Sequence, residues 1–179
     1  MRPLADRRTP PSAIFSSTPS KDAAAETNGP EEGNYGGILT LTTEARFHHF
    51  GLAVSSPENA FRYLAALGYT EGAVEYDPLQ QVNVAMRHHG TMPDVEVIWP
   101  GEGPSPIDRI IKGRDGVIYH LCYTTLDADL TIASLRQTGL QVHTVSEPRP
   151  AVLFGGLNVS FHIVAGVGLI ELIHGQPTR

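Results

Sequence analysis

The chain repeats itself, and each repeat carries one histidine and one glutamate at matching positions. The first copy opens with FHHFGLAV and the second with VIYHLCY, which places His49 and His120 71 positions apart. Each copy closes on an apolar segment with a central acid, Glu96 in the first and Glu171 in the second. An unpaired charge on a buried strand is costly, whereas imidazoles and carboxylates are the ligands of a divalent metal. The repeat therefore predicts a metal site made by these four side chains.

The composition limits the kind of protein that carries this site. With 179 residues and 41% hydrophobic content, the chain can bury one substantial core or two small fused cores. A net charge of −6, without a basic patch, argues against a nucleic-acid partner. The single cysteine, Cys122, excludes an internal disulfide and fits a reducing compartment. No apolar run has the length of a membrane span or of a secretory signal, so the sequence predicts a cytoplasmic protein without membrane association.

The chain divides into four segments. Residues 1–38 are rich in Pro, Ser, Thr, Ala, Gly and Glu and lack an apolar pattern, which predicts a disordered N-terminal tail. A first module is expected over residues 46–100, a linker over 101–116 and a second module over 117–175. The linker begins as a Gly/Pro-rich loop and is expected to end in a short helix.

Apolar periodicity predicts the order β-α-β-β-β in each copy. Pro57 and Asp127 mark the two helix starts, and Gly68 and Gly139 mark the two ends. The expected strands cover residues 47–54, 72–76, 81–88, 94–99, 118–123, 140–145, 158–164 and 169–174. One helix covers only one face of such a module, so the two copies should pair through their uncovered faces. The prediction is an α+β fold in which two tandem βαβββ modules form a curled mixed sheet around a metal-centred cavity.

Strand alternation is consistent with the metal hypothesis. His49 shares a strand face with Gly51 and Ala53, whose small size leaves room for a metal and its substrate. Any one of the four polar residues alone would fit a surface position better than a metal site. Four at repeat-related places favour a site for one divalent ion, which could be Zn, Ni, Co, Mn or Fe. With four protein ligands, one or two coordination positions stay open for a substrate.

Several stretches resemble the vicinal oxygen chelate superfamily, which includes glyoxalase I, methylmalonyl-CoA epimerase, extradiol dioxygenases, fosfomycin-resistance enzymes and bleomycin-binding proteins. The resemblance covers about residues 46–175 and is nearest to the epimerase branch. It rests on the stretches at 48–54, 105–111, 118–121, 147–150, 155–156 and 168–172.

The resemblance implies roles for individual residues. Metal ligands are expected at His49, His120 and Glu171, with a polar ligand at Glu96, where epimerases often have Gln and bacterial glyoxalases have Glu. Glu171 is also the candidate catalytic base. The second catalytic glutamate of epimerases falls at Asn83, whose amide cannot carry a proton at neutral pH, and this departure puts two-base epimerisation in doubt.

The same resemblance suggests a substrate site. Gln81 is expected on the face of Asn83, lining the cavity. Ser105 and Arg109 lie where epimerases bind the nucleotide arm of a thioester, although a solvated linker helix explains them equally well. His48 is expected to point away from the metal, and Cys122 is expected to be a small core residue.

Three functions remain open from the sequence. The leading one is a metal-dependent isomerase or epimerase that polarises a carbonyl or thioester, such as an acyl-CoA, and stabilises an enolate. A glyoxalase-like lyase or a tailoring enzyme of secondary metabolism is the second, and a non-catalytic small-molecule binding or resistance protein is the third. The resemblance favours a homodimer, while two modules in one chain permit a self-sufficient monomer.

Overall fold

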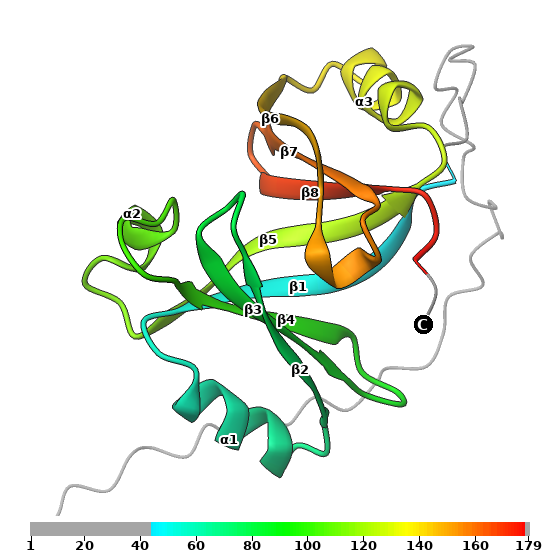
Figure 1. Cartoon of the computed structure of the whole chain (residues 1–179). Helices are drawn as coiled ribbons and strands as arrows, with labels where there is room; N and C mark the ends of the chain where they lie inside the picture. The colour runs from blue at the N-terminus through cyan, green and yellow to red at the C-terminus, as the bar shows by residue number, and fades with distance from the viewer. Residues whose placement is uncertain (1–43, 178–179) are drawn as a thin grey trace, which may run out of the picture. The chain divides into compact units, whose positions relative to one another are not determined.

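The computed structural model describes residues 44–177, and the predicted tail at residues 1–38 lies outside them. The first half contains β1 (Arg46–Val54), α1 (Glu58–Ala66), β2 (Thr70–Asp77), β3 (Val82–His88) and β4 (Asp94–Pro100). After α2 (Asp108–Ile111), the second half contains β5 (Gly116–Thr125), α3 (Ala128–Gln137), β6 (Val142–Pro150), the 3-10 turn η1 (Val152–Phe154), β7 (Asn158–Val164) and β8 (Gly168–His174). The predicted β-α-β-β-β order is confirmed in both halves (Figure 1).

All eight strands form one mixed sheet in the order β2-β3-β4-β1-β5-β8-β7-β6. In each half the first strand pairs in parallel with the last, β1 with β4 and β5 with β8. The halves join edge to edge, because β1 and β5 pair antiparallel at the middle of the sheet. The expected face-to-face pairing of two sheets is therefore replaced by hydrogen bonding between two strands that would otherwise be open edges.

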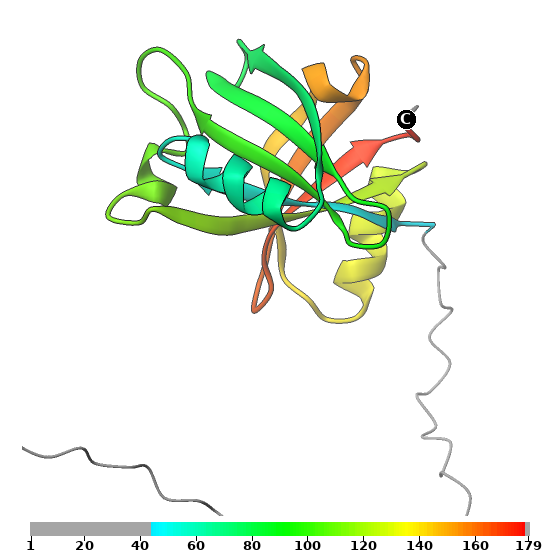
Figure 2. The same cartoon turned by 90° about the horizontal axis from the view of Figure 1, so that it is seen from below.

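The two longer helices cover equivalent places in the two halves. Helix α1 buries Leu64 against Val97 of β4, and α3 buries Ile132 against Leu172 of β8. Figures 1 and 2 show these helices on different halves of the sheet. The predicted cap of α3 is present, since Asp127 accepts a hydrogen bond from the backbone N–H of Leu130 at 2.8 Å. None of the helices within residues 44–177 has the length and apolarity that crossing a bilayer requires.

Helix placement decides which strand residues face the site. Side chains alternate along a strand, so residues next to those under a helix point to the opposite face. Val97 and Leu172 lie under α1 and α3, and their neighbours Glu96 and Glu171 are buried on the helix-free face. This face, called the cluster face below, also carries His49, Ala53, Val84 and Ile98.

The pairing of β1 with β5 is interrupted by two bulges. Phe47 pairs with Tyr123 and His49 with Cys122, so the register between the two strands shifts at His48. Gly51 pairs with His120 and Leu52 with Ile118, so the register shifts again at Tyr119. At a bulge, two residues of one strand oppose a single residue of the other, so the alternation of side chains is broken locally. Each bulge directly precedes one histidine of the repeat.

Candidate metal centre

Four strands bring the repeat-related histidines and glutamates to one point. His49 lies on β1, Glu96 on β4, His120 on β5 and Glu171 on β8, and each is buried. The Nε2 atom of His49 lies 3.3 Å from Oε2 of Glu96 and 3.5 Å from Oε2 of Glu171. The Nε2 atom of His120 lies 3.5 and 3.3 Å from the same two oxygens. The two Nε2 atoms are 3.2 Å apart, and one donor atom from each residue lies within 4.8 Å of all the others.

These separations fit a shared divalent cation. Four donors arranged tetrahedrally at about 2.1 Å from zinc lie about 3.4 Å from one another. The Oε2 atom of Glu171 is buried without a hydrogen-bond partner among the described residues, which is costly for an oxygen that has no other role. Two neutral imidazoles and two carboxylates would also balance the charge of the ion. The cluster of His49, Glu96, His120 and Glu171 could therefore hold a divalent metal.

Burial controls the charge of the four groups. It lowers the pKa of His49 to about 3 and that of His120 to about 4, so both imidazoles are neutral and suited to ligation. Burial also raises the pKa of Glu96, and it raises the pKa of Glu171 well above its ordinary value, with the charge of Glu96 as the next cause. In the metal-free protein, burial thus makes both carboxyls hold their protons more strongly than an exposed glutamate does. A cation would replace those protons.

Gly51 makes room for the cluster. The ring of His120 lies directly over Gly51, so that a Cβ atom built on this glycine would overlap the imidazole. The ring has little freedom to move, because its centroid lies 4.5 Å from that of Tyr119 and 5.8 Å from that of Phe161. Gly51 was expected to leave space for a metal and a substrate. It instead leaves space for the ring of His120, the candidate ligand from the second half.

Two further residues, His48 and Cys122, lie beside the cluster. His48 was expected to point away, but its Nδ1 atom lies 2.8 Å from Nδ1 of His49, because the bulge breaks the alternation. Cys122 is fully buried, as expected of a small core residue, yet its strand partners are His49 and Glu171. Its thiol therefore lies beside the cluster, and burial followed by the charge of Glu171 raises its pKa.

A cavity of about 570 Å³ adjoins the cluster. Tyr119 and Phe161 line it, and their rings also contact the ring of His120. Most of the wall is apolar and consists of Leu79, Pro106, Ile107, Ile110, Val145, Pro150, Val159, Phe161 and Leu169. Its polar residues are Gln80, Tyr119, Ser146, Glu147 and Arg149. An apolar pocket with a few convergent polar groups is the usual form of a small-molecule site.

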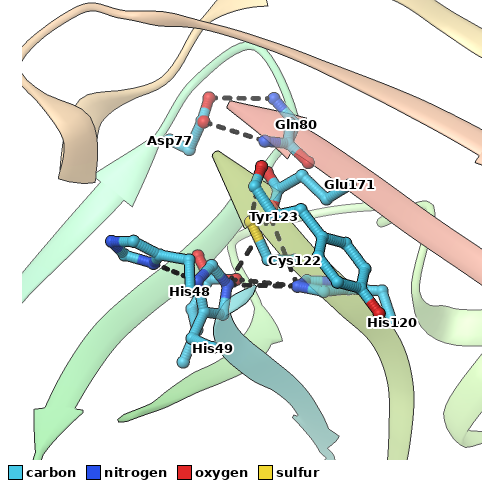
Figure 3. Close-up of polar contacts among 9 residues, drawn as sticks. His48, His49, Asp77, Gln80, His120, Cys122, Tyr123 and Glu171 are labelled. Atoms are coloured by element: carbon cyan, nitrogen blue, oxygen red, sulfur yellow. Dashed lines mark hydrogen bonds and ion pairs between the residues drawn. The ribbon is translucent and has the colours of Figure 1, made fainter. Parts of the chain in front are cut away.

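A buried aspartate fixes one part of this wall. Asp77 ends β2 and accepts a hydrogen bond from the backbone N–H of Leu79 at 2.8 Å. It also accepts hydrogen bonds from the backbone N–H and from Nε2 of Gln80, at 3.1 and 3.2 Å (Figure 3). Its negative charge contributes to the raised pKa of both Glu96 and Glu171. Asp77 thus links the turn that forms the cavity wall to the electrostatics of the cluster.

The structure separates Asn83 from the cluster. On β3, Met86 pairs with Glu96 and Val84 with Ile98, so the even-numbered residues of this strand share the cluster face. Asn83 lies on the other face, where it pairs with Trp99 and its Nδ2 donates to the carbonyl of Pro100 at 3.0 Å. The role that the resemblance implied for Asn83 requires the cluster face, and neighbouring residues of a strand point to opposite faces.

The proposed substrate residues also lie apart from the cavity wall. Gln81 is exposed, has a positive φ of 55° and accepts the backbone N–H of Gly101 through its own carbonyl. Ser105 is buried, and its N–H donates to Asp108 at the start of α2. Arg109 is exposed on α2. The linker does reach the cavity, but through its apolar residues Ile107 and Ile110.

Sequence reasoning missed Tyr119 and Arg149 as cavity residues. Tyr119 is expected to face away from His120 by simple alternation, and only the bulge in β5 brings it to the cavity. Arg149 belongs to the motif Glu147-Pro148-Arg149-Pro150, which extends β6 beyond its expected end and forms part of the wall. In the sequence, the two prolines that flank Arg149 were the signal that could have drawn attention to this residue.

Comparisons with known proteins agree with this geometry. The family model described as "Glyoxalase/Bleomycin resistance protein/Dioxygenase superfamily" matches residues 48–161. Among curated proteins, no significant match to the chain was found.

Solved structures with the same fold include several epimerases. The methylmalonyl-CoA epimerase from Mycobacterium tuberculosis is 21% identical, with a TM-score of 0.61 over 80% of this chain and 95% of that chain. A methylmalonyl-CoA epimerase variant from Streptomyces coelicolor in complex with 2-nitronate-propionyl-CoA is 20% identical, with a TM-score of 0.59 over 75% and 98%. A hypothetical protein from Bacillus halodurans C-125 is 24% identical, with a TM-score of 0.63 over 76% and 98%. At these identities the likeness establishes the fold alone.

Proposed function

The chain belongs to the glyoxalase/bleomycin resistance protein/dioxygenase superfamily, and we propose that it is a metal-dependent isomerase that moves a proton next to a carbonyl group. The observation that carries this proposal is the buried cluster of His49, Glu96, His120 and Glu171 beside a cavity of about 570 Å³. A divalent cation held there would supply Lewis-acid polarisation of a carbonyl oxygen, which lowers the cost of forming an enolate.

Glu171 is the best candidate for the base that takes the proton. Its carboxylate is buried among the atoms that would hold the cation, which places it close to a carbonyl group polarised there. Leu169, two residues earlier on the same face of β8, lines the cavity, so the strand that carries Glu171 also borders the substrate site. In this mechanism Glu171 is both a metal ligand and the proton acceptor.

The cluster face of β3 offers no second base. Val82, Val84 and Met86 occupy that face, and all three are apolar and buried. A proton removed by Glu171 would therefore return to the same side of the carbon faster than to the opposite side. This favours a one-base isomerisation over an epimerisation that needs acids on both sides.

Tyr119 is the group that we expect to stabilise the enolate oxygen. Burial, and then the charges of Glu96 and Glu171, raise the pKa of Tyr119 well above its usual value, so its hydroxyl stays protonated and can donate a hydrogen bond. Replacing Tyr119 with Phe should lower kcat about 100-fold with little change in metal content. Tyr123→Phe is the matched control, because Tyr123 lies on the α3 side of the same strand. Equal kcat values for the two variants would exclude this role.

The cavity favours a substrate with an apolar body and an anionic end. Its wall is mainly apolar, and among the described residues Arg149 is the only cation that lines it. An acyl thioester such as an acyl-CoA has both features, since it joins an acyl group to a phosphate-bearing arm. A solved epimerase of this fold is in complex with 2-nitronate-propionyl-CoA, which supports the same class here.

Hydrogen exchange tests the proposed activity directly. A single stereoisomer of methylmalonyl-CoA, incubated with the metal-loaded protein in D2O, should gain deuterium at the carbon next to the thioester. Exchange should be faster than inversion, because β3 supplies no second base on the cluster face. Mass spectrometry measures the exchange and chiral analysis of the recovered acid measures the inversion. Absence of exchange across a panel of acyl thioesters would exclude the proposal.

A glyoxalase-like lyase is the second candidate. Glu96 gives the cluster two carboxylates, and the sequence resemblance associates this ligand set with bacterial glyoxalases. Turnover of a glutathione hemithioacetal, without exchange into thioesters, would favour the lyase.

A further inference from the structure

His48 lies beside His49 but does not belong to the cluster of His49, Glu96, His120 and Glu171. Because of the bulge in β1, its ring packs next to that of His49, with 5.1 Å between centroids, while the ring of Phe154 lies 5.6 Å away. The Nδ1 atoms of His48 and His49 are 2.8 Å apart, which is a hydrogen-bond distance (Figure 3). The contact therefore joins the cluster to a histidine outside it.

The chemistry of imidazole indicates which of the two rings donates the hydrogen bond. A neutral imidazole carries one proton, on either Nδ1 or Nε2, and only a nitrogen without a proton can bind a metal. Nε2 of His49 faces the other three members of the cluster. It lies 3.3 Å from Glu96, 3.5 Å from Glu171 and 3.2 Å from His120. When Nε2 of His49 binds a metal, the proton of this ring is on Nδ1, from which it can be donated to Nδ1 of His48. His48 in turn carries its own proton on Nε2.

We propose that His48 is a positioning residue that accepts the Nδ1 proton of His49 and so fixes the tautomer and ring orientation needed for metal binding. This proposal rests on the metal centre of the proposed function. A ligating histidine commonly donates its second N–H to a carboxylate, a carbonyl or water, and here a second imidazole takes that place.

The two halves differ in this respect. The Nδ1 atom of His120 is buried and has no hydrogen-bond partner among residues 44–177. In the second half the bulge residue is Tyr119, whose side chain lines the cavity. The duplicated bulge thus provides an orienting acceptor in one half and a substrate-facing hydroxyl in the other. Of the two imidazoles, only that of His49 therefore has a hydrogen bond at Nδ1 among the described residues.

Two substitutions of His48 separate an orienting role from a merely structural one. In His48→Asn, the side-chain oxygen can accept the proton near the former position of Nδ1, whereas His48→Leu fills the space without an acceptor. Competition with a chromophoric chelator should show a 10- to 100-fold loss of Zn²⁺ affinity for His48→Leu. His48→Asn should stay within about threefold of the wild type. His143→Leu is the control, because His143 is exposed on β6.

A tautomer measurement supports the test without any variant. Long-range ¹H–¹⁵N NMR spectra of the wild-type protein, with and without Zn²⁺, should show the His49 proton on Nδ1. In metal-free His48→Leu, the signal should move towards the other tautomer. Equal losses of affinity in the Asn and Leu variants, or a His49 proton on Nε2 in the wild type, would overturn the proposal. If the wild type binds no Zn²⁺, the metal centre fails, and the metal-free spectra still decide the role of His48.

Discussion

Replacing Gly51 with alanine is expected to displace His120 and abolish tight metal binding. The backbone of Gly51 is not in the left-handed region, so alanine fits its dihedral angles, and the effect comes from the overlap of the new methyl group with the imidazole. The ring of His120 cannot shift easily, because Tyr119, Phe161 and His49 surround it with centroids 4.5, 5.8 and 5.3 Å away. A single added methyl group should therefore remove one ligand.

The expected size of this effect follows from what ligands contribute. Loss of an outer partner of a metal ligand typically costs 10- to 100-fold in affinity, so loss of His120 itself should cost at least about 100-fold. Overpacking should also lower the stability of the metal-free protein by about 1–3 kcal/mol. Isothermal titration with Zn²⁺ measures the affinity, and thermal unfolding with a chelator present measures the stability.

Two further variants test whether the overlap with His120 causes the effects of Gly51→Ala. Gly90→Ala is the matched control, because a Cβ atom at Gly90 meets nothing within 4 Å. In the double variant Gly51→Ala/His120→Ala the clash is gone, so its metal-free form should be more stable than Gly51→Ala alone. Wild-type Zn²⁺ affinity in Gly51→Ala would show that the ring of His120 is not a ligand in this position.

Replacing Glu171 with glutamine should prevent metal binding while it stabilises the metal-free protein at neutral and basic pH. Burial raises the pKa of Glu171 in the folded state well above its unfolded value of about 4.5. Its contribution to stability is therefore fully present below pH 4.5 and is lost as the pH rises through the folded pKa. Glutamine does not titrate, so metal-free Glu171→Gln should unfold at a higher temperature than the metal-free wild type at pH 8.

When Zn²⁺ is added, the wild type should unfold at a higher temperature than Glu171→Gln. Zn²⁺ at 100 times its Kd stabilises a folded protein by about 2.7 kcal/mol, and the wild type should gain this while Glu171→Gln should not. Thermal unfolding at pH 5 and pH 8, each with Zn²⁺ and with a chelator, measures both effects. Glu75→Gln, an exposed position on β2, should behave like the wild type throughout. A Zn²⁺-dependent gain in Glu171→Gln equal to that of the wild type would contradict the assignment of Glu171 as a ligand.

The internal repeat accounts for what could be predicted of the fold and the cluster. Apolar periodicity and the start and stop signals of the helices depend on local sequence, so the order of elements in both halves followed from the chain itself. The cluster was predictable for a related reason. An acid in the middle of an apolar strand, as at Glu96 and Glu171, is costly unless a partner meets it, and the repeat indicated which histidines that partner would include.

Predictions that depended on an exact strand register did not agree with the structure. The role implied for Asn83 requires the cluster face, whereas Asn83 lies on the other face of β3. His48 and Tyr119 are bulge residues, and a bulge leaves no signature in an alternating pattern. Arg109 was expected either to contact the substrate or to lie on a solvated linker helix. It is exposed on α2, and Arg149 on β6 supplies the cation in the cavity wall.

The sequence alone determined the elements, their duplicated order and the four side chains that need a common partner, because local periodicity and the cost of burying charge act along the chain. The tertiary structure decided how the halves join, where the cavity lies and what surrounds each ligand. Edge-to-edge pairing of β1 with β5 brings His49 and His120 together over Gly51, and its two bulges turn His48 and Tyr119 towards them. Such contacts depend on register between strands distant in sequence, and register is fixed only when the strands pair.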